Sequence, residues 1–209
     1  MRLSTPLGLY SLKPAFQNVL RPAARRLIRM GIAPNQITIG ACLLSIAAGV
    51  VLSARTLPLQ WFLILPPVLF VRMAMNAIDG LMARDFGRQS QLGAYLNEVT
   101  DVVSDGFLLL PLLRVPGVDP ILVAITIVLA CASEMAGVLG GRRRYEGPMG
   151  KSDRAAVLAV MATLIAGGRS FAARPITPIL AAVCALTAVT IYSRIRAGLD
   201  EVKTHAPGR

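Results

Sequence analysis

The chain has 209 residues, of which 55% are hydrophobic and only 16% are charged, and its mean hydropathy is +0.61. So small a charged fraction cannot cover the surface of a soluble domain, and a membrane is the expected solvent. The net charge of +11 could indicate nucleic-acid binding, but the basic residues lie beside apolar segments, which excludes nucleic acid as a partner.

Six apolar segments approach the roughly 20 residues that cross a bilayer. They are residues 36–53, 58–80, 92–113, 119–140, 153–168 and 174–192, and two of them are short or interrupted. The predicted fold is an all-α integral membrane protein with six transmembrane helices. Short loops and the lack of internal repeats favour one domain over 1–209, with a juxtamembrane segment (1–35), a six-helix core (36–192) and a tail (193–209).

The segment before the first span mixes apolar and basic residues at roughly helical spacing from Leu12 to Met30. We expect an amphipathic helix at the cytoplasmic membrane interface, against anionic headgroups, although a simple topology anchor explains the pattern equally well. The segment has no small-residue cleavage pattern, so a removable signal peptide is not expected.

Basic residues divide unevenly between the two sides of the predicted bundle. The side opposite the N-terminus receives only Arg55, Arg114, Arg169 and Arg174. The positive-inside rule therefore predicts that both termini lie in the cytoplasm, with the loops that follow the second and fourth spans.

The cysteines and the histidine carry no predicted chemistry. Cys42, Cys131 and Cys184 lie singly inside predicted spans, without the spacing of metal ligands. His205 is the only histidine and lies in a polar tail, so histidine-based catalysis is excluded.

Acidic residues gather in one membrane-associated window. Of 11 in the chain, five lie between positions 79 and 105: Asp79, Asp85, Glu98, Asp101 and Asp105. A charged side chain at mid-bilayer costs about 2.5 to 3.5 kcal/mol, so cations or water must accompany these carboxylates.

The spacing of these residues places them on two helix faces. Asn76 and Asp79 are three residues apart, and Asn97, Asp101 and Asp105 follow one another at steps of four. Two such faces, if opposed, form a hard-oxygen site suited to Mg²⁺ or Mn²⁺, ions that commonly hold a diphosphate. The alternative is a polar seam that joins two membrane helices by hydrogen bonds.

A longer motif runs through both faces. It reads Asn76-x-x-Asp79-Gly80-x-x-Ala83-Arg84, eight residues, then Gly93-x-x-x-Asn97-x-x-x-Asp101. It resembles the D-x-x-D-G-x-x-A-R-x8-G-x-x-x-D-x-x-x-D motif of the CDP-alcohol phosphotransferases. The six spans and the segment 34–38 that opens the first span also fit that family.

Two positions depart from the family motif, because Asn76 and Asn97 stand where the family has its first and third aspartates. An asparagine offers a neutral carbonyl oxygen, so we expect weaker metal binding or the loss of one metal. The pattern resembles a bacterial inner-membrane branch of the family with asparagine at both positions.

The resemblance implies a role for each residue of the motif. Asp101 would be the general base and a metal ligand, together with the ligands Asp79, Asn76 and Asn97. The nucleotide and its diphosphate would be bound by Gly80, Ala83, Arg84 and Gly93. On sequence alone, each glycine is explained as well or better by helix packing.

Charged residues outside the motif are interpreted separately. Arg72 lies one turn before Asn76, where it could replace a metal charge or bind a substrate phosphate, or else pair with Asp105 or reach an interface. The family resemblance implies that Lys151 and Arg154 bind the acceptor's phosphate. Arg142 to Arg144 are expected to be topology anchors. Glu134 could line an acceptor pocket or form a structural ion pair.

The function implied by the resemblance is transfer of a phosphoalcohol group from a CDP-alcohol, such as CDP-diacylglycerol, to a hydroxyl acceptor with release of CMP, in phospholipid biosynthesis. A homodimer in a bacterial inner membrane is also implied. The two asparagines leave open a catalytically impaired CDP-lipid-binding homologue, and the buried acids leave open a transporter.

Overall fold

The computed structural model describes residues 13–139 and 143–205, and within these ranges every regular element is a helix. The order is α1 (Lys13–Arg29), α2 (Pro34–Ser53), η2 (Leu59–Ile64), α3 (Leu65–Asp85), α4 (Gln91–Leu109), η3 (Leu110–Arg114), α5 (Pro120–Val138), α6 (Lys151–Ala166) and α7 (Arg169–His205). The predicted all-α class is confirmed.

Local sequence explains where several helices begin. Pro34 and Pro120 occupy first helical positions, where the missing N–H of proline costs nothing. Ser90 caps α4 by accepting a hydrogen bond from the Gly93 amide at 2.9 Å, and Asp119 caps α5 through the Ile121 amide at 2.9 Å.

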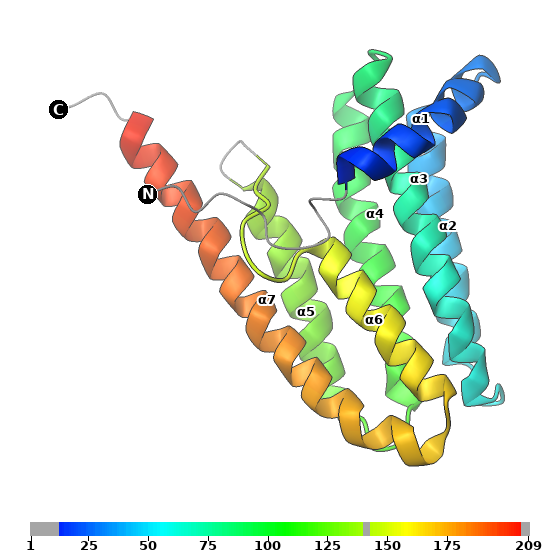
Figure 1. Ribbon diagram of the computed structural model, residues 1–209. Helices are drawn as coiled ribbons and strands as arrows, with labels where there is room; N and C mark the ends of the chain where they lie inside the picture. Colours follow the sequence, from blue (N-terminus) through cyan, green and yellow to red (C-terminus); the bar gives the residue numbers. More distant parts are fainter. Residues whose placement is uncertain (1–12, 140–142, 206–209) are drawn as a thin grey trace.

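The helices form one bundle with α1 outside it (Figure 1). Helix α2 packs against α3 and α4, α5 packs against α4 and α7, and α6 packs against α3 and α7. Helix α1 lies across the end of the bundle where α3 ends, and its Arg21 pairs with Asp85 at 2.8 Å. A helix therefore forms where the amphipathic segment is predicted.

Four described segments are long and apolar enough to cross a membrane: Pro34–Ser53, Leu59–Asp85, Pro120–Val138 and Ile176–Glu201. They correspond to the predicted first, second, fourth and sixth spans. Helix α4 carries the acidic cluster and α6 has only 16 residues, and both run beside the others in the bundle (Figure 1). Helix α7 continues to His205, beyond the predicted end of the last span at residue 192.

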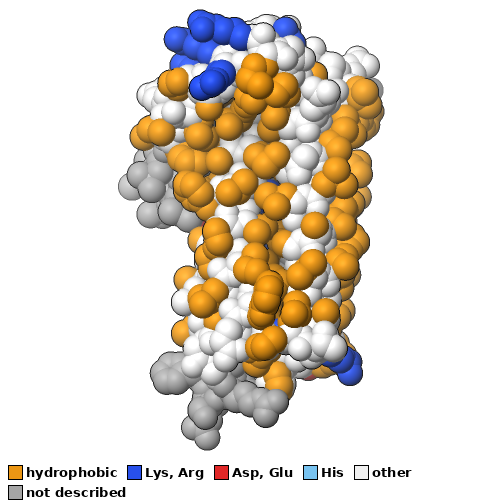
Figure 2. Space-filling model, turned by 90° about the vertical axis from the view of Figure 1, so that its right-hand side faces the viewer, with side chains coloured by type: hydrophobic (Ala, Val, Ile, Leu, Met, Phe, Trp, Pro, Cys, Tyr) orange, Lys and Arg blue, Asp and Glu red, His pale blue; other side chains and the backbone are white. Residues whose placement is uncertain are grey.

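The exterior and the interior are both largely apolar. In Figure 2, hydrophobic side chains cover most of the face in view, and Lys and Arg gather mainly at one end. Inside, Phe62, Leu65, Leu108, Met161 and others form a hydrophobic core that joins η2, α3, α4 and α6. Asp105 of the acidic window lies next to this core, beside Leu108 and Leu109.

Candidate active site

Asp79 is held in the interior by a threonine from the neighbouring helix. It lies on α3 with 7% of its surface exposed, and its Oδ2 accepts a hydrogen bond from the Thr38 hydroxyl at 2.7 Å. Thr38 is on the first turn of α2, within the 34–38 segment. The sequence pointed to this segment but not to the Thr38–Asp79 contact, because the two residues are 41 positions apart.

The two polar faces meet at Asn76 and Asp101. Asp101 on α4 is 3% exposed, and its Oδ1 accepts a hydrogen bond from the Asn76 amide of α3 at 3.3 Å. The ammonium of Lys151 contacts the same oxygen, and Arg72 Nη2 lies 3.6 Å from it. Three side chains thus converge on the proposed base, and two of them are cationic.

Asn97, the other asparagine of the motif, makes a different contact. Its amide nitrogen donates to Glu98 Oε1 at 3.2 Å, and its backbone carbonyl accepts from the Thr100 hydroxyl at 3.3 Å. Its described hydrogen bonds therefore join it to its own helix rather than to α3.

The two glycines of the motif allow close approaches. A Cβ on Gly80 would lie 3.1 Å from both terminal nitrogens of Arg84, so the guanidinium folds over Gly80. A Cβ on Gly93 would lie 2.9 Å from Asn35 Oδ1, so Gly93 makes room for the start of α2. Gly93 thus lies close to the start of α2, and Gly80 lies under the Arg84 side chain.

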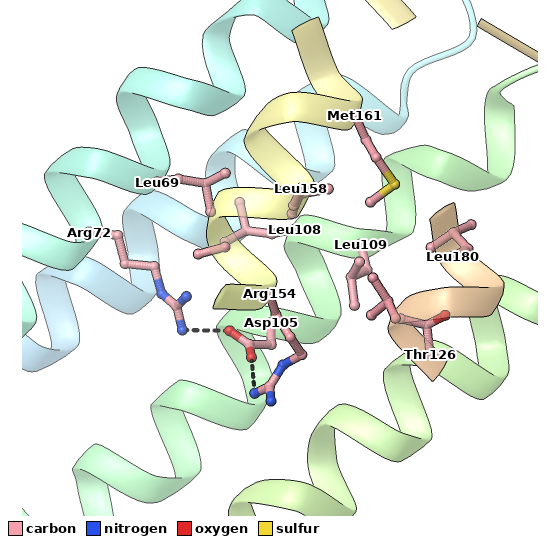
Figure 3. Close-up of a pocket in the computed structure, with 12 residues that line it drawn as sticks. Leu69, Arg72, Asp105, Leu108, Leu109, Thr126, Arg154, Leu158, Met161 and Leu180 are labelled. Atoms are coloured by element: carbon pink, nitrogen blue, oxygen red, sulfur yellow. Dashed lines mark hydrogen bonds and ion pairs between the residues drawn. The ribbon is translucent and has the colours of Figure 1, made fainter. Parts of the chain in front are cut away.

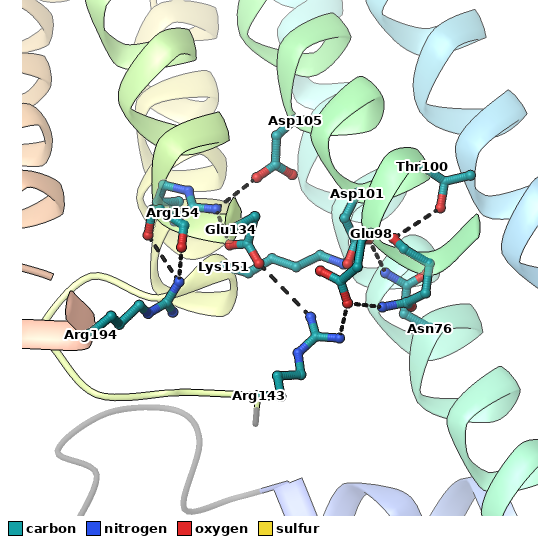
Figure 4. Close-up of polar contacts among 12 residues, drawn as sticks. Asn76, Glu98, Thr100, Asp101, Asp105, Glu134, Arg143, Lys151, Arg154 and Arg194 are labelled. Atoms are coloured by element: carbon teal, nitrogen blue, oxygen red, sulfur yellow. Dashed lines mark hydrogen bonds and ion pairs between the residues drawn. The ribbon is translucent and has the colours of Figure 1, made fainter. Parts of the chain in front are cut away.

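A network of ion pairs extends from Asp101 across the bundle (Figure 4). Arg72 Nη2 lies 2.9 Å from Asp105 Oδ1, and Arg154 Nη2 lies 3.0 Å from Asp105 Oδ2. Arg154 Nη2 also lies 2.7 Å from Glu134 Oε1. The structural pairings considered for Arg72, Asp105 and Glu134 are therefore the ones observed.

The loop before α6 completes the network. Arg143 pairs with Glu98 and lies 3.9 Å from Glu134 Oε2, so it is an ion-pair partner rather than only a topology anchor. Buried Arg194 of α7 donates to the carbonyl and hydroxyl oxygens of Ser133. Sequence reasoning missed both contacts, because charge alone does not tell which helix a long side chain reaches. Arg142 lies outside the described residues.

A small cavity lies beside the network (Figure 3). Arg72, Asp105 and Arg154 border it, and apolar side chains such as Leu69 and Met161 line the rest. Its volume of about 20 Å³ accommodates a water molecule.

The donor set fits a divalent cation in chemical type. Asp79 and Asp101 supply carboxylates, and Asn76 and Asn97 can supply amide oxygens, all of which are hard ligands of the kind that Mg²⁺ and Mn²⁺ prefer. Among the described residues, no three His, Cys, Asp or Glu side chains are grouped to hold a metal. The motif itself supplies two carboxylates, Asp79 and Asp101, and two neutral amides.

The family model described as CDP-alcohol phosphatidyltransferase matches residues 31–192, which include both faces of the site. The chain belongs to this family. The match begins two residues after α1 and ends within α7, so it spans the whole packed bundle apart from α1 and the end of α7.

Relatives within the CDP-alcohol phosphatidyltransferase family include the inner membrane protein YnbA of Escherichia coli, which is 42% identical over 77% of this chain and 81% of its own length. Phosphatidylinositol phosphate synthase of Mycobacterium marinum is 30% identical over 66% of this chain and 58% of its own length. These relatives and the family match establish a membrane phosphatidyltransferase enzyme of phospholipid biosynthesis.

Solved structures of Mycobacterium tuberculosis phosphatidylinositol phosphate synthase share the fold. The complex with manganese and citrate superposes with a TM-score of 0.68 at 20% identity and covers 86% of this chain and 88% of that one. The complex with CDP-DAG gives a TM-score of 0.61 at 21% identity and covers 90% and 93%.

Proposed function

We propose that this enzyme transfers the phosphatidyl group of CDP-diacylglycerol to a hydroxyl acceptor and releases CMP. The proposal rests on the contact between α3 and α4 at the motif. There, Asn76 Nδ2 of α3, which also carries Asp79, donates a hydrogen bond to Asp101 Oδ1 of α4 at 3.3 Å. The CDP-DAG complex of the mycobacterial structure supports the donor, and the names of the synthases support a hydroxyl acceptor.

The mechanism needs a base and a stabilised leaving group. In the proposal, Asp101 takes the proton of the acceptor hydroxyl, the acceptor oxygen attacks the phosphorus distal to cytidine, and the bond from that phosphorus to the CMP oxygen breaks. The Lys151 ammonium and the Arg72 guanidinium both lie against the Asp101 carboxylate. Arg84 would contact the diphosphate, and the small residues Gly80 and Ala83 of α3, with Gly93 of α4, would leave room for the nucleotide.

Mg²⁺ or Mn²⁺ bound by Asp79 and Asp101, with Asn76 and Asn97 as neutral ligands, would neutralise charge on the diphosphate. The manganese complex of the mycobacterial structure supports a divalent ion. In this proposal Asp101 both binds the ion and accepts the proton of the acceptor hydroxyl. The Lys151 ammonium would therefore have to move away from Asp101 before the acceptor hydroxyl can approach.

The proposed setting is a bacterial inner membrane with six spans, α1 at the interface and both termini in the cytoplasm. Lys and Arg gather at the end of the bundle where α1 lies, which supports this orientation (Figures 1 and 2). The E. coli relative named as an inner membrane protein supports the location. A homodimer stays a prediction, and so does membership of a branch with asparagine at both motif positions.

The decisive experiment measures CMP released from CDP-diacylglycerol by the purified protein with Mg²⁺ or Mn²⁺ and a panel of hydroxyl acceptors. Acceptor-dependent CMP release is the expected result. Asn76 and Asn97 favour one competing function, a homologue that binds the donor without turnover. Saturable binding of cytidine nucleotide without CMP release under any condition would establish that function instead.

A further inference from the structure

The ion pairs around Asp101 form a continuous chain, here called the ion-pair chain. In order it contains Lys151, Asp101, Arg72, Asp105, Arg154, Glu134, Arg143 and Glu98. Cations and carboxylates alternate along it, four of each, so their formal charges cancel. The ion-pair chain includes the proposed base, Asp101, and joins α3, α4, α5 and α6.

Glu134 is the member that neutralises the arginines farthest from the base. It is 6% exposed, and its two oxygens face different guanidinium groups, with Arg154 at 2.7 Å and Arg143 at 3.9 Å. Arg154 is 8% exposed and is also bound to Asp105, so its Nη2 already has two carboxylate partners. Glu134 therefore holds the position at which these arginines would otherwise bind an anion.

We propose that Glu134 is a specificity residue that excludes phosphorylated acceptors, so that the acceptor is an alcohol without a phosphate, such as a simple polyol. This inference rests on the proposed transferase function. A phosphate monoester carries about −1.5 to −2 charges, and guanidinium groups are its usual partners. To bind a phosphate through Nη2, Arg154 would have to release Glu134, which would leave that buried carboxylate with only the more distant Arg143.

Two unpaired polar atoms of the ion-pair chain also suit a hydroxyl group. Arg154 Nε and Glu98 Oε2 are buried and have no hydrogen-bond partner among the described residues. A hydroxyl both donates and accepts, so it can satisfy either atom without displacing a carboxylate. An ionised phosphate only accepts, so it cannot satisfy the carboxylate oxygen of Glu98.

The first arm of the test compares matched acceptors, namely glycerol with glycerol phosphate and inositol with inositol phosphate. The wild-type protein should release CMP at least tenfold faster with the unphosphorylated member of the pair it uses. Glu134→Gln should shift this ratio at least tenfold toward the phosphorylated member. Glu146→Gln, a matched loss of one charge at an exposed position of the loop before α6, should leave the ratio unchanged.

The second arm measures binding of inorganic phosphate to the purified protein by calorimetry, which needs no turnover. The wild-type and Glu146→Gln proteins should bind inorganic phosphate at least tenfold more weakly than the Glu134→Gln protein does. This arm decides the inference even if CMP is never released, in which case the proposed function fails separately.

The inference is overturned if wild type prefers the phosphorylated member of a pair, or binds inorganic phosphate as tightly as Glu134→Gln. If gel filtration shows that the Glu134→Gln protein does not fold, the acceptor preference and the phosphate binding of the wild-type protein still test the inference. A wild-type preference for the unphosphorylated acceptor, with no phosphate binding, supports it in that case.

Discussion

Asp101 of α4 receives side-chain contacts from two neighbouring helices, α3 and α6. Asn76, Lys151 and Arg72 each lie within reach of its Oδ1. Asp101 is only 3% exposed, so these side chains supply the polar contacts that water cannot. They hold the carboxylate between α3 and α6, where we propose that it acts as the base.

Replacing Asp101 by asparagine keeps the size of the side chain and removes the base. A positioned general base contributes about 10²- to 10⁴-fold to a rate, so CMP release by Asp101→Asn should fall by that factor. Asp119→Asn is the matched control, because exposed Asp119 only caps α5 and asparagine caps equally well. A loss of less than about tenfold would move the base to another carboxylate, such as Asp105 or Glu98.

Asn76→Asp tests the effect of the missing charge. The substitution places a second carboxylate next to Asp101, since Asn76 Nδ2 lies 3.3 Å from Asp101 Oδ1. Like charges this close repel, and a divalent ion relieves the repulsion. We expect a lower melting temperature than wild type in EDTA and a larger rise on adding Mg²⁺, measured by thermal unfolding in detergent. Equal Mg²⁺-induced shifts in the two proteins would contradict a metal site at this position.

At the scale of elements, the site depends on how closely α2, α3 and α4 approach. Thr38 reaches Asp79 from α2, and Gly93 on α4 makes room for Asn35 of α2. Farther along, a Cβ on Gly49 of α2 would collide with the carbonyl oxygen of Phe107 on α4. Small residues therefore bring the backbones together, as is usual between membrane helices.

Gly49→Ala should force α2 away from α4 and destabilise the bundle by roughly 1 to 3 kcal/mol, the usual cost of overpacking. Gly106→Ala on α4 is the control, because its added Cβ would meet only Ile127 Cγ2 at an ordinary 3.9 Å. Thermal unfolding in detergent compares the two. Equal melting temperatures would show that α2 and α4 can separate without loss of stability.

At the scale of the whole molecule, orientation decides which side of the membrane supplies the substrates. The loop after α3 should lie in the cytoplasm and the loop before α5 on the opposite side. Gln89→Cys and Pro116→Cys, both at exposed positions, test this in a background without the native cysteines. An impermeant maleimide added to intact spheroplasts should label only Pro116→Cys, and labelling of Gln89→Cys instead would reverse the topology.

Much of the bundle could be predicted from the sequence. Hydropathy located four segments that the structure confirms as long and apolar enough to span, and the motif spacing placed Asn76 and Asp101 on faces that meet. These features are local, because one helical period determines which residues share a face. The hydropathy signal is weaker for α4, because that helix carries the acidic residues of the site. It is also weaker for α6, because that helix has only 16 residues.

The sequence by itself determined the helical class, the family and the two polar faces, because apolar length and motif spacing are properties of contiguous residues. Only the tertiary structure decided which cation meets which carboxylate: Arg154 with Glu134 and Asp105, and Lys151 with Asp101. Long flexible side chains can reach several helices, and burial selects the pairing that leaves the fewest charges without a partner.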